Sequence, residues 1–171
     1  ASRGIGHAIS LYYAKKGFNV CVCCHKNADM LDALKDEIEN IGADCMTYVG
    51  NIGIFENAAE FFSLIKERFG KADILINNAG ISYIGLLQDM TPSDWNDIVT
   101  SNLTSVFNCC KLAIPIMLGS HEGKIINISS VWGCVGASTE VAYSATKGGI
   151  NTFTKALAKE LAPSNKTEDR K

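Results

Sequence analysis

Apolar positions along the chain alternate between helical spacing and short continuous runs. Leu31, Leu34 and Ile38 recur at steps of three and four, which is typical of one helix face, and Gly42 provides a stop. Residues 19–24 instead form a short run of Val and Cys, which favours a buried strand. Applied along the whole chain, the two patterns predict helices over 4–16, 28–41, 55–69, 93–118 and 141–161, and strands over 19–24, 44–49, 73–76 and 124–128.

Strands and helices that alternate in this way build parallel βαβ units. The predicted strands are almost continuously apolar, as expected for a sheet that helices cover on both faces. We therefore expect a single α/β domain with a doubly wound parallel sheet. One breaker stands in the long fourth helix, where Pro115 should kink the helix or shorten its end.

Composition excludes several classes of function. The 171 residues suit one domain, and the formal net charge of −2 provides no basic patch for nucleic acid. The sequence contains no run of about 18 apolar residues, so we expect no membrane span. A zinc site at Cys23, Cys24 and His25 would need a second pair of ligands, and the sequence has none with metal spacing. We therefore expect no metal, and we expect the seven cysteines to be free thiols in a reducing cytoplasm.

Two glycine-containing segments lie where a phosphate-bearing ligand would bind. The first comprises Ser2, Arg3, Gly4, Ile5 and Gly6. Its glycines let a phosphate approach the backbone, and the helix that follows favours negative charge at its N-terminus. The second segment comprises Asn77, Asn78, Ala79 and Gly80. It follows a predicted strand, and ligands bind beyond the carboxyl ends of such strands. Ordinary polar turns have the same composition, so neither segment decides the function alone.

A tyrosine and a lysine share one face of the last predicted helix. Tyr143 and Lys147 are four residues apart, about one turn. A neighbouring ammonium favours the phenolate, which makes Tyr143 a usable proton donor or acceptor. A surface tyrosine beside a solvated lysine has the same spacing.

Two further polar residues are candidates for the same site. Ser130 follows the strand over 124–128, where its hydroxyl could donate to a carbonyl oxygen or simply cap a turn. Asn102 lies in the long helix, where it could hold a water near Lys147 or bond only to its own backbone.

In their order along the chain, these motifs resemble the short-chain dehydrogenase/reductase family. The family pattern is T-G-x-x-x-G-x-G, N-N-A-G, an Asn in the fourth helix, a Ser and Y-x-x-x-K. This chain has S-R-G-I-G, N-N-A-G, S-N-L-T, N-I-S-S and Y-S-A-T-K. The Thr and the first Gly of the phosphate loop are absent, as is the usual P-G segment after the last helix.

The resemblance implies a Rossmann fold and a set of roles. Tyr143 is then the acid/base, and Lys147 binds the nicotinamide ribose and tunes Tyr143. Ser130 orients the substrate carbonyl, and Asn102 supports a proton-relay water. Asn51, followed by Ile52, stands where the family often has an Asp beside the adenine.

The residues after the strand over 19–24 bear on the choice of cofactor. Relatives that prefer NAD carry an acid there, which holds the ribose hydroxyls. This chain has His25 and Lys26 at that place and no acid before Asp29, while Arg3 lies in the phosphate loop. A basic cluster suits a 2′-phosphate, which predicts NADP(H), although a solvated basic loop has the same composition.

Within the family, the resemblance is closest to 3-oxoacyl-carrier-protein reductases, which implies reduction of a ketone to a secondary alcohol. Some similar proteins reduce a 5-aminopentanone group on elongation factor P, and a non-catalytic nucleotide-binding protein of the same fold is a further alternative. The family also implies a homodimer or homotetramer that pairs the helices over 93–118 and 141–161 with their copies. Both helices carry extensive apolar surface: Trp95, Ile98, Val106 and Ile114 in the first, and Ile150, Phe153 and Leu157 in the second.

The sequence also predicts that the polypeptide extends beyond these residues. In a doubly wound sheet the first strand is central, and no strand precedes Ala1. We expect a strand before Ala1, missing residues after Asn165 and a false join between Asn165 and Lys166. The nucleotide-binding domain then covers 1–165, and 166–171 is a polar tail or remnant. A fragment that folds with a partner chain is the alternative.

Intact-mass spectrometry of the natural protein tests this expectation. A mass several kilodaltons above 18.4 kDa is the expected result. A mass near 18.4 kDa would contradict it.

Overall fold

Four parallel strands make two pairs in the computed structural model, which describes residues 1–162. Strand β1 (Val20–Cys24) pairs with β2 (Cys45–Val49), and β3 (Ile74–Asn77) pairs with β4 (Lys124–Asn127). The helices are α1 (Gly4–Lys15), α2 (Ala28–Asn40), α3 (Phe55–Phe69), α4 (Pro92–Val99), α5 (Ser105–Ser120), α6 (Trp132–Val135) and α7 (Val141–Leu161). The predicted helices and strands are therefore confirmed, and each predicted bound lies within two residues of the observed bound. The expected domain limit at 165, the join at Asn165 and the segment 166–171 lie outside the described residues.

Helices cover both faces of the strands, and the alternation of side chains along β1 shows how. Val22 points to α1 and α2, where it packs with Ala14, Leu31, Leu34, Ile38 and Cys45. Cys21 and Cys23 both point to the opposite face, toward α3 and α5. The buried residues on that side are Met46, Phe61, Phe62, Ile65, Cys109, Ala113 and Met117. Cys21 and Cys23 thus share one face of β1.

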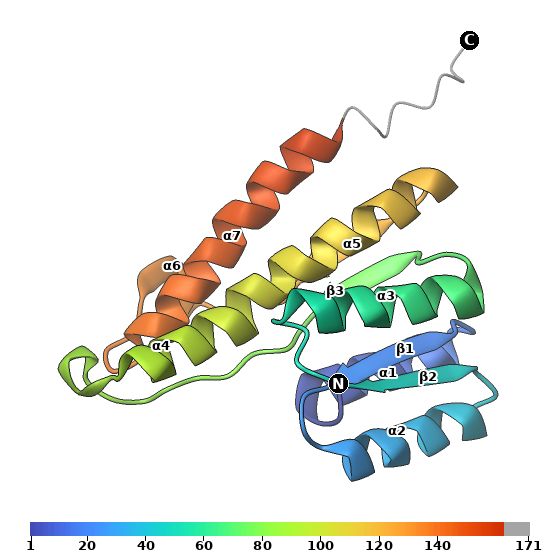
Figure 1. Ribbon diagram of the computed structural model, residues 1–171, viewed down its shortest axis with the longest axis horizontal. Helices are drawn as coiled ribbons and strands as arrows, with labels where there is room; N and C mark the ends of the chain where they lie inside the picture. Colours follow the sequence, from blue (N-terminus) through green and yellow to red (C-terminus); the bar gives the residue numbers. More distant parts are fainter. Residues whose placement is uncertain (163–171) are drawn as a thin grey trace.

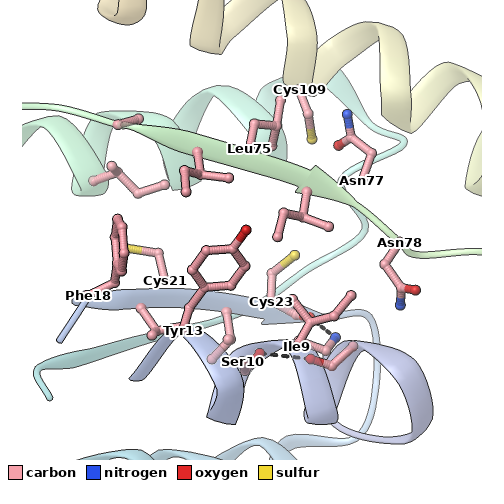
Figure 2. A pocket seen from close by; sticks show the side chains of 18 of the residues that line it. Ile9, Ser10, Tyr13, Phe18, Cys21, Cys23, Leu75, Asn77, Asn78 and Cys109 are labelled. Carbon is pink, nitrogen blue, oxygen red and sulfur yellow. Dashed lines mark hydrogen bonds between the residues drawn. The ribbon is translucent and has the colours of Figure 1, made fainter. Parts of the chain in front are cut away.

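A cavity of about 640 Å³ separates the two pairs of strands. Residues of β1 and β3 line it from opposite sides, and Figure 2 shows Tyr13, Cys21 and Cys23 facing Leu75 and Cys109 across it. Within the described residues, neither β1 nor β3 has a strand partner at this inner edge.

The long helix predicted over 93–118 is helical throughout but not uniform. A π-helical turn, Thr100–Thr104, joins α4 to α5, and the axis runs past Pro115 to Ser120. Pro115 therefore does not shorten the helix, and the alternative expectation of a kink stays a prediction. Proline leaves the carbonyl four residues earlier without its helical partner. That residue is Lys111, which is exposed, so water can bond its carbonyl.

The same helical stretch, Pro92–Ser120, is long and apolar enough to cross a membrane by length and composition. Three of its polar residues, Asn102, Ser105 and Asn108, are nevertheless buried within the protein. Each of them is hydrogen-bonded to protein atoms. These contacts are those of a core helix, and α5 packs directly on α3 (Figure 1).

The cysteine thiols are all free and differ in exposure. Cys45, Cys109 and Cys110 are buried, whereas Cys134 is exposed. Burial raises the pKa of Cys110 to about 11 and that of Cys45 to about 11, and it also raises the pKa of Cys109. A buried neutral thiol reacts slowly, because the thiolate is the nucleophile.

We therefore expect Cys134 to react with a disulfide reagent first, and the three buried thiols to react only as the protein unfolds. Cys134→Ser should remove the fast phase. Because the buried thiols hold their protons more tightly than the unfolded chain does, stability should fall as the pH rises above about 9. Urea unfolding at pH 8 and at pH 10.5 measures this. Equal stability at the two values, or rapid reaction of all seven thiols, would contradict the burial.

Candidate active site

The loops that follow the four strands converge at one edge of the molecule, because all the strands run in the same direction. Most of the candidate residues lie in these loops. The loop residues are His25 and Lys26 after β1, Asn51 and Ile52 after β2, Asn78, Ala79 and Gly80 after β3, and Ser130 after β4. Residues 2–6 reach the same edge, since the Ala1 nitrogen donates to the Cys23 carbonyl at 2.7 Å. The edge is where a doubly wound fold binds its ligand.

The two glycine-containing segments are in direct contact. A Cβ placed on Gly6 would lie 2.9 Å from the Asn78 amide nitrogen and 3.0 Å from the Ala1 Cα, so a larger residue there would force its neighbours to shift. Gly4 adopts a φ of +58°, which glycine tolerates best. The α1 helix has no acidic residue in its first turn and no side-chain cap. Its first amides are therefore available to an anion.

The residues predicted to contact the adenine and the ribose differ in how accessible they are to a ligand. His25, Lys26 and Arg3 are exposed. Asn51 is occupied by its own turn, since its side-chain oxygen accepts the Gly53 amide at 3.0 Å. The Ile52 carbonyl accepts the buried Asn108 amide at 3.0 Å, which fixes this loop from α5.

Tyr143 and Lys147 lie one turn apart on α7, as predicted. The Lys147 ammonium is 5.6 Å from the centre of the Tyr143 ring. Only 4% of Lys147 is exposed, and its Nζ donates to the Ile128 carbonyl at 2.8 Å. Burial lowers the pKa of Lys147 below its usual value, because it disfavours the charged amine. The lysine is thus an interior residue and not the solvated surface lysine of the alternative reading.

Backbone packing explains how Lys147 is held. A Cβ on Gly133 would lie 2.6 Å from the Lys147 carbonyl carbon, so α6 rests directly on the α7 backbone. Ser129 donates to the Lys147 carbonyl at 3.1 Å, and Asn151 donates to the Gly133 carbonyl at 3.3 Å. Gly80 approaches from the other side, where a Cβ placed on it would lie 3.6 Å from Lys147 Nζ.

Ser130 lies between β4 and α6, and its hydroxyl oxygen accepts the Trp132 amide at 3.2 Å. It therefore caps the turn that begins α6. Accepting this bond leaves the hydroxyl proton free to donate. The capping role and the predicted contact with a carbonyl oxygen are compatible.

Asn102 is fully buried in the π-helical turn. Its amide nitrogen donates to the Ile81 carbonyl at 2.9 Å and to Thr146 Oγ1 at 3.2 Å, and its oxygen accepts the Ile81 amide at 2.8 Å. Both amide protons are therefore used by the protein. A proton-relay water at Asn102 stays a prediction, and it would have to contact the backbone carbonyl or the remaining lone pair.

Several residues support the site from the interior: Asn77, which the sequence placed in a ligand-binding segment, is buried instead, and the others were not predicted from the sequence. Asn77 donates to Asn127 at 2.8 Å, and Asn127 donates to Thr154 at 2.9 Å, which links β3, β4 and α7. Asn108 and Gly133 have equivalent supporting roles. A sequence pattern could have indicated these asparagines, because each is an amide residue at the end of an apolar strand or on an apolar helix face.

Comparison with known proteins identifies the class. The family model described as short chain dehydrogenase matches residues 1–167. A 3-oxoacyl-[acyl-carrier-protein] reductase of Staphylococcus aureus is 42% identical over 165 residues, which cover 95% of this chain and 66% of that protein. An acetoacetyl-CoA reductase of Cupriavidus necator is 38% identical over 93% of this chain and 65% of its own length.

Solved structures agree. A metagenomic short-chain oxidoreductase in complex with NADP superposes with a TM-score of 0.91 at 30% identity, covering 96% of this chain and 73% of that chain. A protein described as a short-chain alcohol dehydrogenase from Sinorhizobium meliloti has a TM-score of 0.91 at 34% identity, with 96% and 65% covered. The fold is thus a nucleotide-binding α/β fold with parallel strands, as predicted. The chain belongs to the short-chain dehydrogenase family, and it spans 66% of the length of the Staphylococcus aureus relative.

The three bonds of Asn102 predict a large effect of its removal. Asn102→Ala removes the side chain that bonds the part-buried amide and carbonyl of Ile81, which costs about 1–3 kcal/mol for each group left unsatisfied. We expect urea unfolding to show a loss of about 2 kcal/mol in the free energy of unfolding. Asn96→Ala is the control, because Asn96 is exposed on the preceding helix. Equal stability of the two variants would contradict this role of Asn102.

Proposed function

We propose that this protein is an NADP(H)-dependent oxidoreductase that reduces a ketone to a secondary alcohol. The observation that carries the proposal is the buried Lys147 ammonium. It donates a hydrogen bond to the Ile128 carbonyl and lies 5.6 Å from the centre of the Tyr143 ring. A protein that merely binds a nucleotide has no need of a buried cation beside a phenol. This argues against the alternative of a non-catalytic relative.

The side chains divide the chemistry between them. Tyr143 donates its phenolic proton to the carbonyl oxygen as that oxygen gains negative charge. Lys147 stabilises the phenolate that Tyr143 leaves, and the Ser130 hydroxyl orients the carbonyl by a hydrogen bond. Within residues 1–162, hydrogen bonds use one of the three Lys147 donors. The other donors are available to ribose hydroxyls.

The residues present suit a dinucleotide. Gly4 and Gly6 carry no side chain, and they lie at the α1 N-terminus, which has no side-chain cap. That arrangement suits a pyrophosphate, and Asn78, Ala79 and Gly80 would border the nicotinamide half. When bound, the cofactor supplies the hydride that reaches the carbonyl carbon.

A preference for the phosphorylated cofactor is part of the proposal. Exposed Arg3, His25 and Lys26 would bind the 2′-phosphate, and no carboxylate before Asp29 would compete with it. One similar solved protein is described as a complex with NADP.

The substrate and setting follow from the relatives. The proposed substrate is a 3-oxoacyl group on a carrier, because similar curated proteins are named for that reaction. A 5-aminopentanone on modified elongation factor P is the alternative substrate.

We place the enzyme in the cytoplasm, where free thiols stay reduced. We expect a homodimer or homotetramer that pairs α4–α5 and α7 with their copies. Exposed Trp95, Phe107 and Leu118 supply apolar surface for such a contact.

Replacement of Tyr143 tests the proton donor. Tyr143→Phe should lower turnover of a β-keto ester with NADPH by about 100- to 10,000-fold, with cofactor binding kept. Lys147→Ala should weaken both turnover and NADPH binding, because it serves both. Tyr12→Phe, on an exposed tyrosine of α1, is the control. Unchanged turnover in Tyr143→Phe would remove the central claim.

The cofactor preference is tested by steady-state kinetics. We expect kcat/KM for NADPH to exceed that for NADH by about tenfold or more, since charge-assisted hydrogen bonds contribute about 1.5–3 kcal/mol. Lys26→Glu should reduce or reverse the ratio, whereas Lys155→Glu, on the exposed face of α7, should not. Equal efficiency with the two cofactors in the unmodified protein would refute the preference.

A further inference from the structure

Two segments from distant parts of the chain meet beside Tyr143. One is the loop after β3, and the other is the turn 137–140 that leads into α7. The Gly85 amide donates to the Thr139 carbonyl at 2.9 Å, and the Ser82 hydroxyl donates to Glu140 Oε1 at 2.5 Å. Thr139 has a φ of +63°, which a β-branched residue rarely adopts. The backbone strain at Thr139 indicates that this meeting of segments is specified rather than incidental.

The contact adjoins the segments that surround the Tyr143–Lys147 pair. On one side, Gly80 faces Lys147 Nζ, and Asn102 bonds both backbone groups of Ile81, so Ser82 is held next to these residues. On the other side, Glu140 is the residue before α7 and stands three positions before Tyr143. The backbone of Glu140 is thus held at the start of α7, and its carboxylate is held by Ser82. Along the helix, Glu140 is within about one turn of the proposed proton donor, Tyr143.

Glu140 is a carboxylate that lacks a counterion within the described residues. Glu140 is half-buried, and its side chain makes no capping hydrogen bond to α7, although Glu140 is the N-cap residue. Within residues 1–162 its carboxylate has no cationic group within 4.0 Å. The residues beside this contact are apolar and exposed, with Ile81 at 45%, Ile84 at 79% and Val141 at 42%. The Glu140 carboxylate therefore lies beside exposed apolar side chains at the start of α7.

We propose that Glu140 determines substrate specificity by favouring ketones that carry a cationic group, such as an alkylammonium, a few bonds from the carbonyl. The carboxylate attracts the cation while the apolar residues contact the linking carbon chain. Ser82 holds the carboxylate in place. The inference rests on the proposed ketone reduction.

The test compares two ketones of the same shape. One is a methyl ketone that ends in a trimethylammonium group, and the other is its neutral isostere that ends in a tert-butyl group. The measured quantity is the ratio of kcat/KM for the cationic ketone to that for the neutral one, with NADPH and the full-length protein. Because the ratio is taken within each variant, a loss of folded or active enzyme cancels.

We expect a ratio of about ten or more in the unmodified protein, since a tenfold preference needs only one partly solvated charge pair. Glu140→Gln keeps an acceptor for Ser82 but removes the charge, and it should bring the ratio to about one. Ser82→Ala keeps the charge of Glu140 but removes the hydrogen bond that holds the carboxylate in place, so it should lower the ratio in part. Glu160→Gln is the matched control, because Glu160 is exposed on the same helix about 30 Å away by helical rise.

The outcomes separate the two proposals. If the unmodified protein shows no preference, or if Glu140→Gln keeps the preference, the role of Glu140 is wrong although ketone reduction stands. If neither ketone is reduced, the proposed function fails and the role of Glu140 fails with it. Added salt should lower the ratio in the unmodified protein, because it screens the charges, and should leave the ratio in Glu140→Gln unchanged.

Discussion

The burial of the Lys147 ammonium is the constraint on which the arrangement of the site depends. Removing a charged amine from water is costly unless it finds a hydrogen-bond acceptor. The Ile128 carbonyl supplies one, and the Tyr143 ring lies beside the charge. Ile128 is available because β4 ends one residue earlier, although its own amide still bonds to Asn77. The end of the strand, the β3 loop and α7 must therefore meet at one point.

Buried amide side chains hold the loops around that point. A loop packed against the interior must find partners for its backbone groups, and an asparagine offers both donors and an acceptor. Asn102 does this for the loop after β3, and Asn108 does it for the loop after β2. Both come from the long helical stretch Pro92–Ser120, so one core element orders two loops of the candidate site (Figure 1). This is why Asn102 has a structural role whether or not it holds a water.

Local patterns predicted most of the framework. The step of three and four in α2, the glycine that ends α3 and the apolar run of β1 each depend on neighbours a few residues away. Tyr143 and Lys147 were found for the same reason, since helical spacing alone puts them on one face. Pro115 shows the limit of this reasoning, because its effect depends on whether the freed carbonyl meets water or the core. The π-helical turn and α6 were missed, since long-range packing specifies both.

The sequence by itself determined which residues are helical, which are extended and which side chains can carry the chemistry. It did so because helical and strand periodicity, glycine conformations and side-chain functional groups are properties of short segments. Only the tertiary structure decided that Lys147 is buried, that Asn102 is committed to Ile81 and that Glu140 meets Ser82. Burial, hydrogen-bond partners and local charge depend on segments that the chain brings together from as far as 58 residues apart, and no short pattern records them.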